Sequence, residues 1–259
     1  MRFYSCYALD LDGTLYRGSE VVPGAQETLS QLEASGAKIL YVTNNSGLMR
    51  LDYVAKLASF GFKAEQNQII TSGVVAAHYC AANKLSRVFV VGEPGLVGTF
   101  RELGVDVVNS DDKGNVGISS EGAQCLVSGI CRSALSYQLL DAAMQVAMET
   151  KTYIACNKDQ TYPVEAGKFC PGSGAIVAAI EACSGVKATV VGKPEPAILL
   201  DALTQIGIAP QDTLMIGDRM DTDIACGKAA GADTCLVLSG VTRTAVEGQW
   251  CVDSVKDLV

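Results

Sequence analysis

The chain has 259 residues, of which 49% are hydrophobic and 26 are glycine, a composition typical of an α/β protein with one large domain or two smaller ones. Its net charge of −8, without a cluster of Lys and Arg, disfavours a nucleic-acid-binding surface. No apolar run reaches the ~20 residues of a membrane span, and no signal peptide is expected before the first strand. We therefore predict a cytoplasmic protein.

The ten cysteines are expected to be free thiols, as in a reducing cytosol. Most fall inside apolar or periodic segments, where free Cys behaves as a small hydrophobe. The sequence lacks a Cys-x-x-Cys pair, and His78 is its only histidine, so a structural zinc site is disfavoured.

The first seventy residues alternate short apolar runs with helical patterns. Strands are expected at residues 3–9 and 38–42, and helices at 25–34 and 49–60. This β-α-β-α alternation predicts a parallel sheet with right-handed crossovers. Both strands end in polar clusters, and ligands of such sheets bind beyond the carboxyl ends of the strands.

The middle of the chain, from about residue 74 to 185, is long enough for an inserted α/β module of its own. It follows a short transition at 69–73. The expected elements, in chain order, are a helix at 74–83, a strand at 87–92, a helix at 95–103, a strand at 105–108, a loop at 109–122, a strand at 124–130, a helix at 137–148, a strand at 152–156, a loop at 157–172 and a helix at 175–182.

From residue 189 the first alternation resumes, and the tail to Val259 is expected to be peripheral. The expected elements are a strand at 189–191, a helix at 196–206, a strand at 212–216, a helix at 224–230 and a strand at 234–238. The pattern predicts one parallel sheet, built from both ends of the chain and interrupted by the insertion.

Four of the expected strands end in polar clusters. These clusters are Asp10 with Asp12, Thr43 with Asn44, Lys193, and Asp218 with Asp221 and Asp223. Asp10 and Asp12 are two positions apart and share one face of a strand, so their repulsion requires a cation or a proton. Oxygen ligands without His or Cys indicate Mg²⁺, whereas Thr43 and Lys193 suit phosphate oxygens. Together the clusters predict an Mg²⁺-dependent phosphoryl-transfer site with a carboxylate nucleophile.

Each cluster alone also has an ordinary structural explanation. The segment after Val42 could be a plain turn, and Lys193 a solvated side chain. Acidic residues such as Asp221 and Asp223 stabilise the start of a helix. Arg219 could contact phosphate or form a salt bridge with Asp221. The occurrence of all four clusters at strand ends favours the catalytic interpretation.

Four stretches of the chain read Asp10-Leu11-Asp12-Gly13-Thr14, Val42-Thr43-Asn44-Asn45-Ser46, Gly192-Lys193-Pro194 and Gly217-Asp218-Arg219-Met220-Asp221-Thr222-Asp223. Together they resemble the four motifs of the haloacid dehalogenase (HAD) superfamily, in its NagD-like class IIA branch of p-nitrophenyl, phosphoglycolate and pyridoxal phosphate phosphatases. The resemblance implies a Rossmann-like, doubly wound core of residues 1–73 and 186–259, with a C2-type α/β cap inserted at 74–185.

The resemblance also implies roles for individual residues. Asp10 would be the nucleophile, and Asp12 the general acid and base. Mg²⁺ would be held by Asp10, the backbone carbonyl of Asp12, Asp218 and, directly or through water, Asp223. The residues implied to bind the phosphate or line the site are Thr43, Asn44, Asn45, Lys193, Arg219, Met220, Asp221 and Thr222. In the cap, the loop 157–163 would carry Asn157 and Asp159 as contacts to the leaving group.

The sequence thus predicts an Mg²⁺-dependent phosphatase that hydrolyses small phosphomonoesters, with p-nitrophenyl phosphate and phosphoglycolate as implied substrates. A phosphomutase, or a phosphatase for nucleotides, sugar phosphates or pyridoxal phosphate, stays open as an alternative. Receiver domains also cluster Asp, Thr and Lys at strand ends, but they lack an insertion of this size. The expected partner is a small phosphorylated metabolite, not nucleic acid or membrane, and the resemblance adds a homodimer through the cap.

Overall fold

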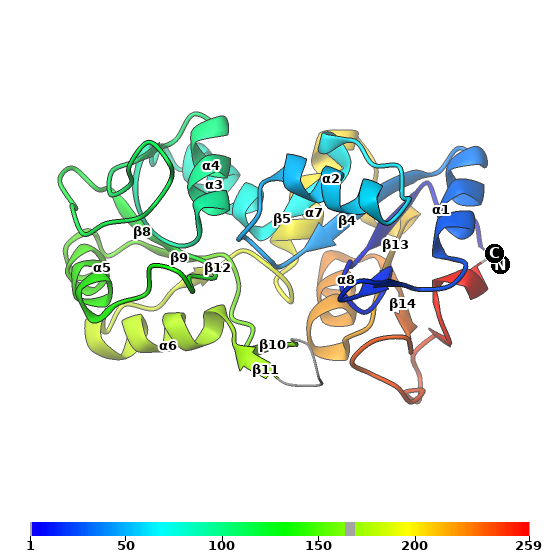
Figure 1. The fold of residues 1–259 in the computed structure, drawn as a ribbon. Helices are drawn as coiled ribbons and strands as arrows, with labels where there is room; N and C mark the ends of the chain where they lie inside the picture. The colour runs from blue at the N-terminus through cyan, green and yellow to red at the C-terminus, as the bar shows by residue number, and fades with distance from the viewer. Residues whose placement is uncertain (1, 164–168, 259) are drawn as a thin grey trace. The chain divides into compact units, whose positions relative to one another are not determined.

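The computed structural model describes residues 2–163 and 169–258, and tertiary contacts divide the chain into two units (Figure 1). Unit 1 consists of Met1–Thr43, Tyr53–Ile70 and Lys193–Val259, and unit 2 of Asn44–Asp52 and Thr71–Gly192. The main part of unit 2, Thr71–Gly192, therefore extends a few residues beyond each end of the expected insertion at 74–185. Unit 2 also includes Asn44–Asp52, which begins within the second polar cluster. The assignment of unit 1 as catalytic core and unit 2 as cap stays a prediction.

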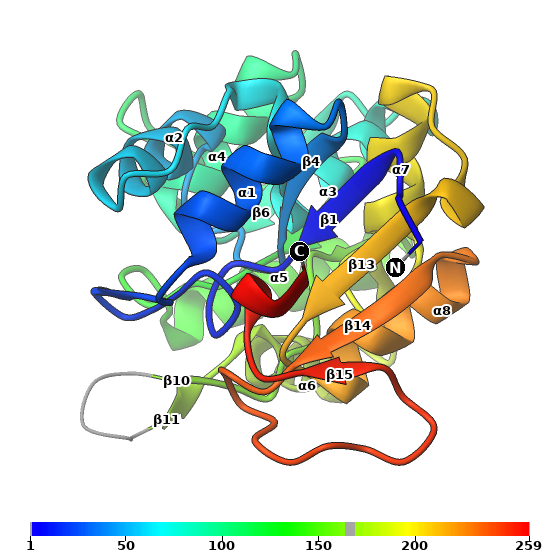
Figure 2. The same cartoon turned by 90° about the vertical axis from the view of Figure 1, so that its right-hand side faces the viewer.

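Unit 1 is built on a six-stranded sheet in the order β15-β14-β13-β1-β4-β5, which confirms the predicted open α/β core. Figure 2 shows β1, β13 and β14 side by side. The pairs formed among β1, β4, β13, β14 and β15 are parallel. The strands are β1 Cys6–Leu9, β4 Lys38–Thr43, β5 Ile69–Thr71, β13 Thr213–Gly217, β14 Asp233–Val237 and β15 Cys251–Val252.

Helices cover both faces of this sheet because its strands are apolar on both sides. Alternate residues of the strands, such as Leu9 and Ile216, pack in one core with Leu29 and Leu57 from the first two helices. On the opposite face, Gly227 lies so close to Met215 that an added Cβ would stand 2.8 Å from the Met215 Cβ. The helices are α1 Ala25–Ala34, α2 Arg50–Ser59, α7 Ala197–Ile206 and α8 Ala225–Ala230 (Figure 2).

Unit 2 contains a second sheet, in the order β12-β9-β8-β6-β7, with parallel pairing throughout. Its strands are β6 Arg87–Val91, β7 Asp106–Val107, β8 Cys125–Ser128, β9 Tyr153–Ala155 and β12 Thr189–Val190. Phe89 and Leu126 pack against Ala143 and Ile180 of two helices on one face. The helices are α3 Ser72–Ala82, α4 Pro94–Glu102, α5 Tyr137–Thr150 and α6 Ser173–Ser184; α3 and α4 lie on the other face (Figure 1).

Two hairpins differ from the sequence-based expectation. The loop expected at 157–172 contains an antiparallel hairpin of β10 Thr161–Pro163 and β11 Phe169–Pro171, whereas its residues 164–168 lie outside the described residues. A short hairpin, β2 Tyr16–Arg17 and β3 Glu20–Val21, follows the first polar cluster. These strands are too short to show a period in the sequence, since two or three residues do not establish alternation.

The C-terminal tail is integrated into unit 1 rather than peripheral. β15 extends the sheet beside β14, and Val255 and Leu258 are buried in the same core as the first helix. The expected peripheral position was wrong. The 3-10 turn Val255–Leu258 places its two apolar side chains, three positions apart, on the same side, and both are buried there.

All ten cysteines lie among the described residues and are free thiols, as expected from the sequence. In the described ranges, 2–163 and 169–258, no helix combines the length and the apolar content needed to cross a membrane.

Glu181 on α6 ties this helix to two neighbouring segments of unit 2. Its carboxylate accepts hydrogen bonds from Lys158 Nζ at 2.7 Å, from Ala188 N at 2.9 Å and from Lys187 Nζ at 3.3 Å. Burial alone would raise the pKa of Glu181, but these donors outweigh burial and hold the pKa at about 2. The charged form of Glu181 therefore stabilises the folded state.

The pH dependence of stability follows from the sign of this shift. Because the folded pKa lies below the ordinary value of 4.5, the stabilisation is complete above that pH and is lost as the pH falls toward 2. We expect Glu181→Gln to lower the melting temperature at pH 6 and to have a smaller effect at pH 3. Circular dichroism melts at both pH values test this, and equal losses would contradict it.

Candidate active site

Asp10 and Asp218 meet at the carboxyl edge of the unit 1 sheet. The Asp10 N–H donates to the carbonyl oxygen of Ile216 at 2.8 Å, so pairing with β13 continues one residue beyond β1. Strand β13 ends at Gly217, and Asp218 follows directly. Parallel pairing of neighbouring strands thus brings two distant carboxylates to one place.

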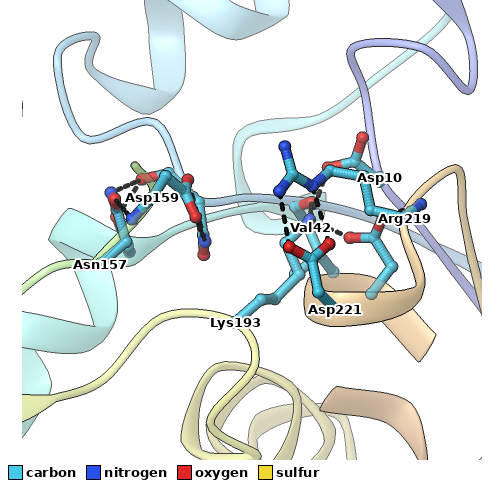
Figure 3. Close-up of polar contacts among 10 residues, drawn as sticks. Asp10, Val42, Asn157, Asp159, Lys193, Arg219 and Asp221 are labelled. Carbon is cyan, nitrogen blue, oxygen red and sulfur yellow. Dashed lines mark hydrogen bonds and ion pairs between the residues drawn. The ribbon is translucent and has the colours of Figure 1, made fainter. Parts of the chain in front are cut away.

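Lys193 contacts two of the predicted carboxylates, of which Asp10 is labelled in Figure 3. Its Nζ is 2.5 Å from Asp10 Oδ1 and 2.7 Å from Asp223 Oδ1, and it donates to the carbonyl oxygen of Val42 at 3.1 Å. The Lys193 residue is only 2% exposed. Burial alone would lower the pKa of Lys193, but Asp10 and Asp223 raise it above its ordinary value, so the ammonium stays charged.

Asp10, Asp218 and Asp223 form a carboxylate cluster, each with one oxygen within 4.8 Å of an oxygen of the others. Burial and the neighbouring Asp223 and Asp218 raise the pKa of Asp10 well above its ordinary value, against the lowering effect of Lys193. Burial and Asp223 likewise raise the pKa of Asp218 to about 6. One ammonium does not compensate three carboxylates, so the cluster favours a further cation.

Two glycines leave room for the Asp218 side chain, which is buried. A Cβ added to Gly13 or to Gly240 would overlap Asp218 Oδ2. The same oxygen accepts a hydrogen bond from Val241 N at 2.6 Å, which orients the carboxylate. The residues present fit a divalent metal ion, because the donors are oxygen atoms, are prearranged and carry excess negative charge.

We expect Gly240→Ala to weaken divalent metal binding without changing any charge. The added methyl must displace the Asp218 carboxylate, so the dissociation constant for Mg²⁺ should rise by about 10-fold or more. Isothermal titration calorimetry measures this. Gly117→Ala is the matched control, because a Cβ there meets only the Asn109 carbonyl, at 3.7 Å; equal metal affinities in both variants would contradict the role of Gly240.

Asp12 follows Asp10 by two residues and lies opposite Tyr16 in an isolated backbone bridge. The Asp12 residue is exposed at the surface, but desolvation by the surrounding protein raises the pKa of its carboxyl group. The charges of Lys56 and Lys193 partly oppose this rise. The Lys56 ammonium lies 4.2 Å from the centre of the Tyr16 ring. A carboxyl group with a raised pKa is suited to donate a proton.

The last predicted cluster forms a π-helical turn over Met220–Ile224, which leads into α8. Arg219 N donates to Asp223 Oδ2 at 3.1 Å and so fixes this carboxylate. The Arg219 guanidinium pairs with Asp221 through contacts of 2.7 and 3.0 Å (Figure 3). This hydrogen-bonded pair lowers the pKa of Asp221. Of the two interpretations of Arg219, the salt bridge is observed; Met220 and Thr222 lie in the same turn.

Thr43 ends strand β4 of unit 1 and is buried. The next two predicted residues belong to unit 2. Asn44 donates through Nδ2 to both carboxylate oxygens of Asp159, at 3.1 and 3.2 Å, and its carbonyl accepts from Asn157 Nδ2 at 2.7 Å (Figure 3). Asn45 Oδ1 accepts the Gly47 N–H at 2.8 Å, as in a turn.

The segment after β14 is a part of the site that the sequence analysis missed. Ser239 Oγ donates to the carbonyl of Gly13 at 2.7 Å, and Gly240 and Val241 surround Asp218. The signal was present, since Ser239-Gly240 is another polar and small pair just beyond a strand end.

The chain matches two family models. Residues 7–106 match the model described as haloacid dehalogenase-like hydrolase, and residues 190–258 match the HAD-hydrolase-like model. The chain is 34% identical to the 5'-nucleotidase YutF of Bacillus subtilis, over 94% of this chain and 90% of the relative. It is 32% identical to an acid sugar phosphatase of Staphylococcus aureus, over 93% and 89%.

Solved structures with the same fold include two phosphatases and NagD. A p-nitrophenyl phosphatase from Archaeoglobus fulgidus superposes with a TM-score of 0.89 at 31% identity, covering 99% of this chain and 98% of that one. NagD from Escherichia coli gives 0.86 at 27% identity, with coverage of 99% and 98%. A glycerol phosphate phosphatase from Mycobacterium tuberculosis in complex with calcium gives 0.85 at 29%, with coverage of 98% and 74%.

Proposed function

This chain belongs to the haloacid dehalogenase-like hydrolases and is a phosphatase of that family, and we propose that it hydrolyses small phosphomonoesters with Mg²⁺ through an aspartyl-phosphate on Asp10. The observation that carries the proposal is the cluster of Asp10, Asp218 and Asp223 around the buried Lys193 at the carboxyl edge of the sheet. At that edge of the sheet, a phosphate group and a divalent cation can bind next to the nucleophilic carboxylate.

The metal in this proposal would be held by Asp10, Asp218 and Asp223, together with the backbone carbonyl of Asp12. A bound divalent cation supplies positive charge that offsets the charge of the phosphate oxygens. Mg²⁺ fits best because it prefers carboxylate oxygens and needs few protein ligands beside a phosphate. Among similar structures, the M. tuberculosis glycerol phosphate phosphatase contains calcium, another cation that prefers oxygen ligands.

The proposed reaction has two displacements at phosphorus. First, an Asp10 oxygen attacks phosphorus and the bond to the ester oxygen breaks, while Asp12 donates its proton to that oxygen. Second, the Asp12 carboxylate takes a proton from water, whose oxygen attacks phosphorus and releases inorganic phosphate and free Asp10. Lys193 and the Thr43 hydroxyl would bind phosphate oxygens, while Met220, Thr222 and the Arg219–Asp221 pair would line the site.

The proposed substrate class is a small phosphomonoester. Similar proteins are named 5'-nucleotidase, acid sugar phosphatase, p-nitrophenyl phosphatase and glycerol phosphate phosphatase. Their names have a phosphate monoester in common and differ in the alcohol that leaves. We propose accordingly that the chemistry of the phosphate site is shared and that nucleoside monophosphates and sugar phosphates are the first esters to examine.

A panel of phosphate esters tests this function. Phosphate release is measured from p-nitrophenyl phosphate, phosphoglycolate, pyridoxal phosphate, a nucleoside monophosphate and glucose 6-phosphate, with Mg²⁺ and after removal of metal by EDTA. We expect turnover that disappears with EDTA and returns with Mg²⁺. Turnover that is unchanged after metal removal would contradict the metal dependence, and conversion of a sugar phosphate to an isomer without phosphate release would indicate a phosphomutase.

A further inference from the structure

The loop that follows β9 in unit 2 carries Asn157 and Asp159, the two side chains that the sequence analysis assigns to the leaving group. In the structure, the polar atoms of Asn157 are occupied within the protein. Asn157 Nδ2 donates to the Asn44 carbonyl at 2.7 Å, and Asn157 Oδ1 accepts from Asp159 N at 3.1 Å. Asn157 is also only 3% exposed. A buried amide whose oxygen and nitrogen both have partners is poorly placed to contact a variable alcohol.

The side chain of Asp159 is directed to the same residue. Both of its carboxylate oxygens lie within hydrogen-bond distance of Asn44 Nδ2, at 3.1 and 3.2 Å. A hydrogen bond from an amide to a charged carboxylate is stronger than one between neutral groups. Asp159 therefore fixes the rotamer of the Asn44 side chain.

Two further groups restrict Asn44. The Ser72 hydroxyl at the start of α3 donates to the Asn44 carbonyl at 2.5 Å, so this oxygen accepts two hydrogen bonds. Gly192 leaves the space that the Asn44 amide occupies, since a Cβ there would lie 2.6 Å from Asn44 Oδ1. Backbone and side chain of Asn44 are thus both held, although Asn44 lies outside any regular helix or strand.

We infer that Asn157 and Asp159 are positioning residues that hold Asn44 in place and thereby support the rate of phosphoryl transfer, rather than select the leaving group. This inference rests on the proposed function and on the role that the resemblance implies for Asn44, which directly follows Thr43 in the chain and would contribute to substrate binding. A misplacement of about 1 Å in such a group lowers the rate by as much as ~100-fold. Because this effect acts at the phosphate group and not at the alcohol, the rate should fall by a similar factor for every ester.

A double-mutant cycle tests whether Asp159 acts through Asn44. We expect Asp159→Ala to lower kcat by about 10- to 100-fold, and Asp159→Asn, whose amide oxygen still accepts one hydrogen bond, to lower it less. If Asp159 acts through Asn44, then adding Asp159→Ala to Asn44→Ala changes kcat by less than about 3-fold. Multiplication of the two single effects would overturn the inference.

Substrate selectivity provides the second readout. The ratio of kcat/KM between p-nitrophenyl phosphate and a sugar phosphate should stay within about 2-fold of the wild-type ratio in Asp159→Ala and Asn157→Ala. A larger change in that ratio would show that these side chains contact the leaving group and would overturn the inference. Lys158→Ala is the matched control in the same loop, because its ammonium pairs with Glu181 and not with Asn44.

Thermal unfolding separates failure of this inference from failure of the proposed function. The melting temperatures of the same four proteins of the cycle report the coupling between Asn44 and Asp159 without any turnover. Melting effects that simply add would overturn the inference. A wild-type protein that hydrolyses no ester of the panel would overturn the proposed function and with it the effect on rate, whereas the melting cycle would still measure the contact.

Discussion

Asp10→Asn is expected to lower the kcat of the phosphatase by on the order of 10⁴-fold or more, an effect typical of removing a covalent nucleophile. The amide oxygen that replaces the carboxylate is a far weaker nucleophile and forms no stable bond to phosphorus. The substitution also removes one of the three carboxylates of the cluster, so Mg²⁺ should bind more weakly. Phosphate release from p-nitrophenyl phosphate at saturating Mg²⁺ measures the first effect, and calorimetric titration measures the second.

Asp111→Asn is the matched control for this substitution. Asp111 is an exposed residue of unit 2 whose carboxylate accepts hydrogen bonds from Lys113 N and Asn115, so its loss should leave kcat unchanged. A folded Asp10→Asn protein that keeps a tenth or more of the wild-type rate would contradict the role of Asp10.

Lys193→Met is expected to lower both activity and stability. The variant leaves Asp10 and Asp223 without their buried counter-ion, which costs about 3–5 kcal/mol of unfolding free energy in comparable buried pairs. Loss of a positive donor to a phosphate oxygen should lower kcat by about 10²- to 10³-fold. Because an ammonium repels a divalent cation, Mg²⁺ should raise the melting temperature of the variant more than that of the wild type.

The control is the same substitution in a different environment. Lys158 forms an ion pair with Glu181 at 2.7 Å, as close as the pair between Lys193 and Asp223, but the Lys158 side chain is 40% exposed. Lys158→Met should therefore cost less than about 1 kcal/mol. Chemical denaturation of the metal-free proteins measures both values. Equal losses of unfolding free energy in the two variants would contradict the view that burial makes the Lys193 ion pairs important for stability.

The fold class could be predicted from the sequence because buried parallel strands are short apolar runs with a polar break at the carboxyl end. The family could be predicted because four stretches of the chain resemble the motifs of the haloacid dehalogenase superfamily. The comparisons and the structure confirm both predictions. The hairpin β10–β11 and the burial of Leu258 could not be predicted, since they depend on tertiary packing of segments too short to have a period.

The candidate site was predictable in its residue types and less so in its contacts. Strand ends indicated Asp10, Lys193 and Asp218, but only the fold shows that the Lys193 ammonium lies between two carboxylates. The sequence likewise could not show that Asp159 faces Asn44, because the two residues are far apart in the chain. The roles of these residues, the identity of the metal as Mg²⁺, the substrate and a homodimer through the cap stay predictions.

A covalent phosphate on Asp10 is the central claim, and chemical trapping tests it most directly. The wild-type enzyme is mixed with substrate and Mg²⁺, quenched in acid within milliseconds and reduced with borohydride, which converts an aspartyl-phosphate to homoserine. Mass spectrometry of the peptide spanning Asp10 and Asp12 then locates the change. We predict homoserine at position 10, and none in Asp10→Asn. Turnover without any modification of Asp10, or modification of Asp12 instead, would contradict the mechanism.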